Sequence, residues 1–207
     1  MAINTNPGTP IRHIATFSSS GTFTAPAGTT VAFVSIHGAS GGGGGAGTGR
    51  YGGFSRYQPQ AGGTGVIGSA FVEITGGGAH TVTIGAGGTA GAARTGGGRY
   101  FSTIGNAGTA GGTSSFDNAL FVTGGAGGVG GGVQSSTTGG AAGSASGTVT
   151  LSTVSPTGAL TKVKTIASQV TGANAAGAAG AQPSHPSRYQ TGTSGSAGIG
   201  ATMYIYA

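Results

Sequence analysis

The chain has 207 residues, of which 50 are glycine and none is cysteine, so its length fits one domain and disulfide bonds are excluded. Only 5% of the residues are charged and the formal net charge is +6, which excludes disorder by charge repulsion and gives a weak field for an anionic partner. We expect a folded protein with a small apolar core that works inside an assembly, because ordering glycine costs more backbone entropy than ordering any other residue.

The N-terminal part predicts an extended arm followed by strands. Residues 1–15 are expected to form the arm, because Pro7 and Pro10 disfavour helix. This stretch has no signal-peptide pattern, and the chain has no apolar run long enough to span a membrane. The run "VAFVSIH", residues 31–37, is apolar on both alternating faces, which predicts a strand buried on both sides.

The middle of the chain predicts short strands between glycine-rich stretches. The runs "SAFVEI" and "TVTIG" are joined by "TGGGAH" and predict a β-hairpin, and the strict alternation of the second run predicts one buried face. The run "ALFVTG" predicts a further short strand. These elements favour an all-β fold.

The last third of the chain is less regular. Residues 134–194 form an insert in which the segment 160–170 fits either a short helix or a strand, and the sequence leaves both open. The C-terminal run "IGATMYIYA" predicts a strand, so one glycine-rich β domain is expected over residues 16–207.

The four letters "SRYQ" occur twice, at residues 55–58 and 187–190. Each copy ends a glycine-rich stretch and leads into an apolar run, "AFVEI" after the first copy and "TMYIY" after the second. Glu73 and Ile205 take equivalent places in the two copies. The repeat therefore predicts that the two runs share one sheet, as neighbours or further apart.

Three segments in order resemble the glycine-rich domain of bacteriophage tail fibres and minor tail proteins. They are "GTFTAPAGTTVAFVSIHGASGGGGG", "FVEITGGGAHTVTIGAGG" and "GNAGTAGGTSSFDNALFVTGGAGG", and a terminal aromatic-aliphatic strand follows them. The resemblance covers about residues 16–133 and 195–206, and the insert departs from the pattern. It implies a small, jelly-roll-like β-sandwich with long glycine-rich loops at one end. In some phage adhesins such tracts pack as bundles of polyglycine II helices, and the sequence leaves open whether these do.

The chain carries no persuasive catalytic, metal-binding or cofactor-binding motif. "GASGG" matches a nucleophile elbow around Ser40, but an elbow needs a following helix, which polyglycine does not form. "GTGRYG" matches a dinucleotide-binding pattern through its glycine content alone. The two acidic residues, Glu73 and Asp117, are expected to be hydrogen-bonding residues. The histidines lack paired metal-ligand spacing; they are His13, His37, His80 and His185. We therefore expect a protein that is not an enzyme and that has no metal and no cofactor.

Four of the six tyrosines directly follow an arginine, and these pairs are the candidate binding or interface residues. They are Arg50 and Tyr51, Arg56 and Tyr57, Arg99 and Tyr100, and Arg188 and Tyr189. The favoured interpretation is subunit contact, because both residue types are enriched in interface hot spots. A second interpretation is glycan binding, with tyrosine stacking on sugars and arginine pairing with phosphate or carboxylate. Arginine-glycine segments that bind RNA are usually far more basic.

The resemblance implies a non-catalytic virion structural protein, made in the host cytoplasm. A tail fibre, tail-tip component or adhesin that contacts the host surface is the first hypothesis. A capsid decoration protein or head fibre is the alternative, and a cell-wall glycine-rich protein is a more distant one. The expected partners are further copies of the chain, with a trimer favoured, other virion proteins at the arm, and a host cell-surface glycan. Nucleic acid and membrane insertion are not expected.

Overall fold

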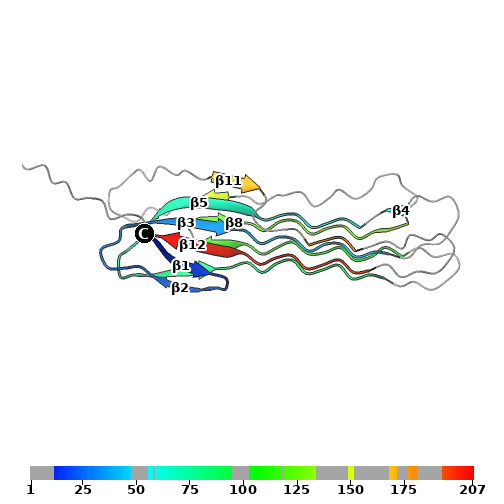
Figure 1. Ribbon diagram of the computed structural model, residues 1–207, viewed down its shortest axis with the longest axis horizontal. Coiled ribbons are helices and arrows are strands. Elements are labelled where there is room, and N and C mark those ends of the chain that lie inside the picture. Colours follow the sequence, from blue (N-terminus) through cyan, green and yellow to red (C-terminus); the bar gives the residue numbers. More distant parts are fainter. Residues whose placement is uncertain are drawn as a thin grey trace, which may run out of the picture.

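The computed structural model describes residues 12–47, 56–57, 59–94, 103–117, 119–133, 149–151, 168–171, 177–180 and 193–207. This part of the chain contains strands and extended tracts and no helix, so no helix in it could cross a membrane. The strands gather in a β-sandwich at one end, and extended tracts run from it side by side to the other end (Figure 1). The all-β prediction is therefore confirmed.

Two antiparallel sheets form the sandwich. The first sheet has the order β1-β12-β3-β5-β11, with β1 His13–Phe17, β12 Thr202–Tyr206, β3 Val31–His37, β5 Val66–Glu73 and β11 Ser168–Thr171. The second sheet has the order β10-β8-β7-β6-β2, with β10 Val149–Leu151, β8 Leu120–Val122, β7 Ser114–Phe116, β6 Ala79–Thr83 and β2 Gly21–Thr24. A separate two-stranded pair, β4 Arg56–Tyr57 with β9 Gly132–Val133, lies at the far end of the extended tracts (Figure 1).

A small apolar core fills the space between the two sheets. Alternate residues of β3, β6 and β12 point into it, because successive side chains of a strand face opposite sides of the sheet. The largest fully buried members are Phe116, Ile36, Leu120, Met203 and Ile205. The one-sided burial predicted for "TVTIG" is confirmed, since β6 alternates between exposed and buried residues.

The prediction that β3 is buried on both sides is confirmed for one face only. Ala32, Val34 and Ile36 are fully buried on the inner face. Phe33, Ser35 and His37 are half-buried on the outer face. The apolar outer residue, Phe33, packs against aromatic side chains of the neighbouring strands, which explains why an outer position is apolar.

The predicted hairpin between "SAFVEI" and "TVTIG" is wrong. β5 belongs to the first sheet and β6 to the second, so the turn between them carries the chain across the sandwich. Gly77 lies in that turn with a φ of 74°, a conformation that glycine adopts without strain. The crossing lets Val72 and Val82 enter the same core from opposite sheets, and their burial stabilises the crossover.

The repeated phrase correctly predicted that β5 and β12 share one sheet. They are not neighbours, because β3 lies between them. Val34 pairs with Ala70 on one side and with Ile205 on the other, so Glu73 and Ile205 are not equivalent in the sheet. Glu73 is exposed, whereas Ile205 is fully buried.

The remaining strand predictions fall on different parts of the chain. The strands expected near 119–124 and at the C-terminus are β8 and β12. β1 begins at His13, so the last residues of the expected arm belong to the sandwich. Of the ambiguous segment 160–170, the part within β11 is strand, and residues 160–167 lie outside the described residues, as do residues 1–11 and most of the insert.

Candidate functional site

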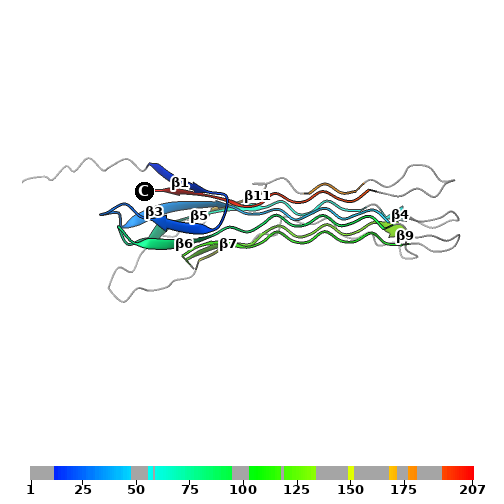
Figure 2. The ribbon, with the colours of Figure 1, turned by 90° about the horizontal axis from the view of Figure 1, so that it is seen from below.

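Seven extended tracts of the described chain run side by side away from the sandwich (Figures 1 and 2). We call them the glycine bundle. They comprise residues 38–47, 59–65, 85–94, 103–112, 124–131, 177–180 and 193–201. Tract 38–47 is the central tract, and the other six are the ring tracts.

The central tract donates backbone hydrogen bonds to three ring tracts in rotation. Each of these three ring tracts accepts hydrogen bonds from every third N–H group of the central tract, at donor–acceptor distances of 2.9–3.0 Å. The donor–acceptor pairs are Ser40–Ile199, Gly43–Ser196 and Ala46–Thr193, then Gly41–Gly63 and Gly44–Gln60, then Gly42–Thr109 and Gly45–Asn106. A repeat of three residues per turn, with no hydrogen bonds inside the tract, is the geometry of polyproline II and polyglycine II helices.

The other three ring tracts donate to the carbonyl groups of the central tract. These bonds measure 2.8–3.0 Å and also recur every third residue. The donor–acceptor pairs are Gly88–Ser40, Gly91–Gly43 and Arg94–Ala46, then Gly125–Ala39, Gly128–Gly42 and Gly131–Gly45, then Gly177–Gly41 and Gly180–Gly44. The central tract is therefore hydrogen-bonded to six neighbours, and it is buried along residues 38–47.

Adjacent ring tracts also bond to one another and close the ring. Their order around the central tract is 59–65, 124–131, 103–112, 85–94, 193–201, 177–180 and back to 59–65. One bond from each contact is Gly63–Ala126, Gly108–Gly128, Thr109–Thr89, Gly198–Gly88, Ser196–Ala178 and Gly62–Gly177, written donor first, at 2.6–3.0 Å. The glycine tracts therefore pack against one another as a bundle. The sequence had left this arrangement open.

Glycine is required where tracts meet because the backbones approach too closely for a side chain. An added Cβ on any of residues 41–45 would lie 1.8–2.3 Å from a carbonyl oxygen of a ring tract. Real Cβ atoms do not approach within 3.0 Å. The five consecutive glycines therefore have no room for alanine on any side of the central tract.

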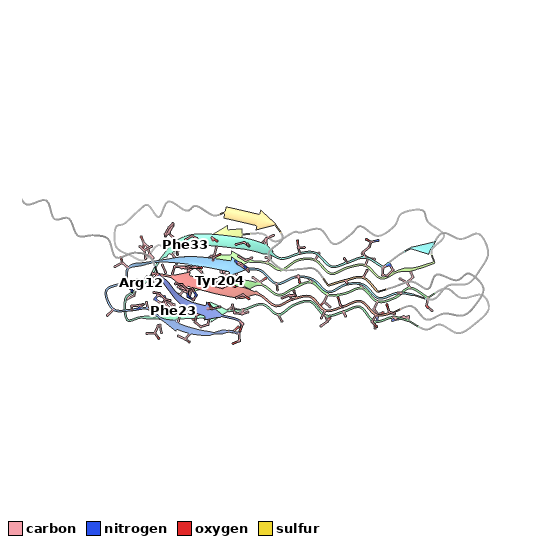
Figure 3. The ribbon with its side chains drawn as sticks, in the orientation of Figure 1. Arg12, Phe23, Phe33 and Tyr204 are labelled. Atoms are coloured by element: carbon pink, nitrogen blue, oxygen red, sulfur yellow. The ribbon has the colours of Figure 1, made fainter. Side chains whose placement is uncertain are left out.

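Residues that face away from the bundle carry side chains. In tract 103–112, an added Cβ on Gly105 or Gly108 would meet the central tract, whereas Ala107 and Ala110 are exposed. Tract 124–131 repeats the rule, with Val129 41% exposed and the adjacent Gly128 buried. Figure 3 shows few and small side chains along the bundle compared with the sandwich. The sequence thus separates glycine at contacts from other residues at the surface.

This period of three was the signal missed in the sequence. Glycines recur at 105, 108 and 111, at 85, 88 and 91, and at 195 and 198. In each case the repeat marks the side of a tract that faces a neighbour. A count of glycine spacing would have favoured the bundle over loose loops.

Ser40 has a structural role in the bundle. Its side chain is fully buried at the base of the central tract, and its Oγ accepts a hydrogen bond of 2.7 Å from the backbone N–H of Ile199. The Ser40 N–H donates to the Ile199 carbonyl at 2.9 Å, so side chain and backbone hold the same neighbour. The elbow-like motif is therefore a junction between sandwich and bundle.

The distal end of the bundle holds one of the predicted arginine–tyrosine pairs. The backbone of Arg56 and Tyr57 forms β4 at this end, paired with β9 (Figure 1). The other three pairs lie outside the described residues; they are Arg50 and Tyr51, Arg99 and Tyr100, and Arg188 and Tyr189. In the sequence these follow Gly47, Arg94 and Gly180, the last described residues of three tracts that lead away from the sandwich.

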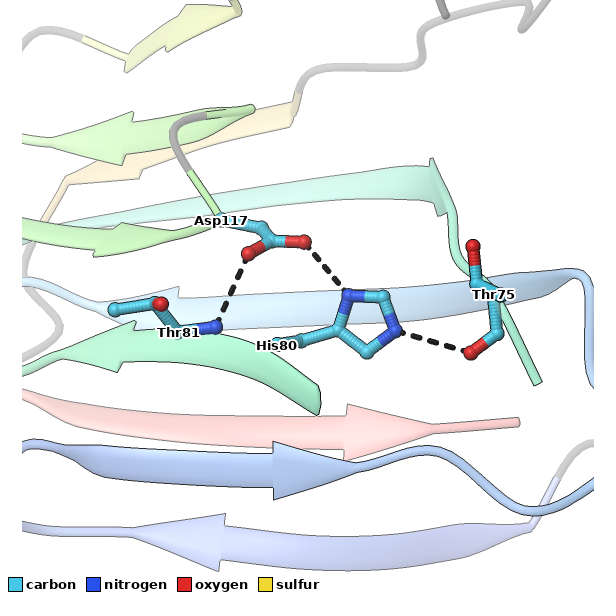
Figure 4. Close-up of polar contacts among 4 residues, drawn as sticks. All are labelled: Thr75, His80, Thr81 and Asp117. Carbon is cyan, nitrogen blue, oxygen red and sulfur yellow. Dashed lines mark hydrogen bonds and ion pairs between the residues drawn. The ribbon is translucent and has the colours of Figure 1, made fainter. Parts of the chain in front are cut away.

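A contact between a buried histidine and an exposed aspartate lies at the opposite end of the molecule. His80 Nδ1 is 2.6 Å from Asp117 Oδ2, and its Nε2 is 3.3 Å from the Thr75 carbonyl (Figure 4). Asp117 Oδ1 accepts from the Thr81 N–H at 3.0 Å. His80 stacks on Phe116 at a centroid distance of 5.8 Å. These contacts tie the β7–β8 turn to β6. Glu73 lies in the other sheet, so the two acidic residues do not form a pair.

The outer face of the first sheet carries an aromatic row that sequence analysis did not predict. Cross-strand register places His13, Tyr206, Phe33 and Phe71 side by side on four strands, with ring centroids 5.1–6.0 Å apart. His37 contacts Tyr204 edge to face at 5.0 Å, and its burial lowers the pKa of the imidazole below its ordinary value. Offset and edge-to-face pairs at these distances stabilise a sheet.

The described residues contain no cluster of three or more histidine, aspartate or glutamate side chains that could hold a metal ion. What the described geometry offers is a hydrogen-bonded bundle with one end fixed in a sandwich. No protein-family model matches this chain, and no curated protein is detectably similar to it.

Proposed function

We propose that this chain is a non-catalytic structural protein of a bacteriophage virion, a tail fibre, tail-tip component or adhesin that contacts the host surface through the distal end of its glycine bundle. The observation that carries the proposal is the bundle itself. Its central tract is hydrogen-bonded on six sides, and its ten residues span about 28 Å at the polyproline II rise of about 3.1 Å per residue. It holds its distal end well away from the sandwich.

A bundle of this kind suits a spacer better than a catalytic site. Along residues 41–45 its interior is backbone, and its contacts are backbone carbonyl and amide groups that bond to each other. Such an interior offers no acid, base or nucleophile, because those groups belong to side chains. Many short hydrogen bonds between tracts instead resist bending, which is what a projecting element needs.

The sandwich end suits attachment. Arg12 and Ala207 exchange backbone hydrogen bonds of 3.0 and 3.1 Å at the end of the molecule opposite the bundle (Figure 1). Residues 1–11 precede Arg12 in the chain and would dock to another virion protein from that end. Attachment there leaves the distal end of the bundle facing outward.

The distal end suits contact. It holds the backbone of Arg56 and Tyr57, residue types that are enriched in interface hot spots and that bind sugars and anionic groups. The resemblance of three segments to the glycine-rich domain of phage tail fibres supports a position on the phage tail. The alternative role, a capsid decoration protein or head fibre, would use the same two ends to brace or extend the shell.

Immunogold electron microscopy of purified virus particles, with antibody against this chain, tests the proposal. We expect gold at the tail tip or the fibres. Gold spread over the head would replace the proposal with the decoration alternative. Particles without gold, in a preparation where an antibody against a known virion protein labels normally, would overturn both.

A further inference from the structure

The ring tracts differ from the central tract in one respect that bears on self-association. The central tract is hydrogen-bonded to six neighbours, so a tract of this geometry has room for six. Tract 103–112 has three neighbours among the described residues, which are the central tract, 124–131 and 85–94. Half of its circumference therefore faces outward, although its backbone is of the same kind.

The outward side of this tract still carries hydrogen-bonding backbone. The N–H groups of residues 105, 106, 108, 109, 111 and 112 all donate to neighbouring tracts. The N–H groups of Ala107 and Ala110 have no partner among the described residues. A backbone with every third donor unused is suited to receive a further tract.

Side chains occupy the outward side of this tract, where a further tract would have to bind. Ile104, Ala107 and Ala110 form an exposed row on tract 103–112, and Ala126 and Val129 form a row on the adjacent tract 124–131. A further tract in the lattice would lie against both rows. At contacts between tracts in this bundle, a Cβ added to any of residues 41–45 would lie 1.8–2.3 Å from a carbonyl oxygen of a neighbouring tract. Moving the backbones apart by about 1 Å to relieve this lengthens a hydrogen bond to about 3.9 Å, which is no longer a bond.

We propose that these outward rows close the bundle at its seven described tracts and keep glycine tracts of a second copy of this chain from adding to it. The surface between tracts 103–112 and 124–131 is a latent docking surface for polyglycine, blocked by five side chains. The same steric clash has two effects. Between tracts of the bundle it requires glycine, and on the outward side it keeps a further tract from binding wherever a residue carries a Cβ.

The test compares two variants with the wild-type chain by analytical ultracentrifugation over a range of concentrations. The first is the fivefold variant Ile104→Gly, Ala107→Gly, Ala110→Gly, Ala126→Gly and Val129→Gly. The matched control places serine at the same five positions, which removes the apolar groups and keeps every Cβ. We expect the glycine variant to associate, with about a doubling of its weight-average mass relative to wild type at the same concentration, and the serine variant to sediment as wild type does.

Circular dichroism in the polyproline II region shows whether each variant keeps its bundle. If the fivefold variant loses the bundle, the fourfold variant Ala107→Gly, Ala110→Gly, Ala126→Gly and Val129→Gly, which keeps Ile104 and clears the rest of both rows, provides the result. An intact glycine variant that sediments as wild type overturns the proposal. Equal association of the serine variant also overturns it, because apolar surface and not the Cβ barrier would then control association.

Discussion

A Cβ added to Gly43 would lie 1.9 Å from the carbonyl oxygen of Ala178, although the two residues come from distant parts of the sequence. The Gly43 N–H also donates to the Ser196 carbonyl, and the Gly43 carbonyl accepts from the Gly91 N–H. Three other tracts therefore contact this one residue. The close approach exists because each tract supplies a bare backbone where it meets the next. Stability of the bundle therefore depends on the absence of side chains at named positions.

Gly43→Ala is expected to destabilise the protein by at least about 3 kcal/mol, the upper range for overpacking, because rigid backbone surrounds the new methyl group. For a chain of this size that corresponds to a fall in Tm of about 6–12 °C. The matched control is Gly200→Ala, where the nearest atoms to an added Cβ are 3.8 Å away. Thermal unfolding followed by circular dichroism measures both, and equal Tm values for the two variants would contradict the packing described for Gly43.

Hydrogen exchange is expected to follow the period of three. In tract 103–112 the backbone amides of residues 105, 106, 108, 109, 111 and 112 donate to other tracts and should exchange slowly. Those of Ala107 and Ala110 should exchange quickly. Nuclear magnetic resonance resolves individual amides, and uniform fast exchange through the tract would argue against a bonded bundle. The seven consecutive donors of residues 40–46 should all be protected, which serves as the internal control.

The sequence contained enough information for the sandwich and too little, as interpreted, for the bundle. Alternation in "TVTIG" and the apolar run "TMYIY" indicate inward faces, and both strands form. The hairpin prediction failed because pattern alone does not say which sheet a strand joins; it indicates that Val72 and Val82 are buried, as they are, but not from which sheet each one enters the core. Partner strands are chosen by long-range packing, which local propensity does not report.

The sequence left the bundle open for a different physical reason. Glycine content alone is compatible with loose loops as well as with close packing, whereas at Gly41 or Gly105 the glycine reflects close contact, with a carbonyl oxygen within 2.0 Å of an added Cβ. Hydrogen bonds between tracts also join residues far apart in the chain, such as Gly43 and Ser196. The aromatic row of His13, Tyr206, Phe33 and Phe71 was missed likewise, because it exists only after β12 is inserted between β1 and β3.

Asp117→Ala is expected to cost about 3 kcal/mol of stability, since it removes a charge-assisted contact with His80 and the acceptor for the Thr81 N–H. Asp117 also has a φ of 49°, which asparagine tolerates better than alanine. Asp117→Asn keeps an acceptor for Thr81 and should therefore cost only about 1 kcal/mol. Denaturant unfolding distinguishes the two, and identical losses would show that the acceptor kept by asparagine contributes nothing to stability.

Stability is expected to fall as the pH drops below about 6.5, the ordinary pKa of histidine, through the lowered pKa of His37. The folded state holds the imidazole neutral, so the unfolded state takes up its proton first and gains stability relative to the folded state. His37→Gln should make the decline of Tm with falling pH less steep. Thr202→Ser, directly opposite His37 in the sheet, is the control because it changes no titrating group. An unchanged slope in His37→Gln would exclude His37 as the source.

Binding of the purified protein to host cells is expected to weaken when the distal pair is removed. In the double variant Arg56→Ala and Tyr57→Ala we expect about a 30-fold loss of affinity, equivalent to about 2 kcal/mol for a hot spot. β4 is a two-residue strand at the end of the bundle, so the Tm should change little. Tyr204→Ala, which alters the outer face of the sandwich, is the matched control and should bind as wild type does. If the arginine contacts an anionic group, wild-type binding should also weaken as salt rises, because screening acts on exposed charges. Equal binding by the distal variant and the wild type, with gold label at the tail tip, would mean that contact with the host does not use this pair.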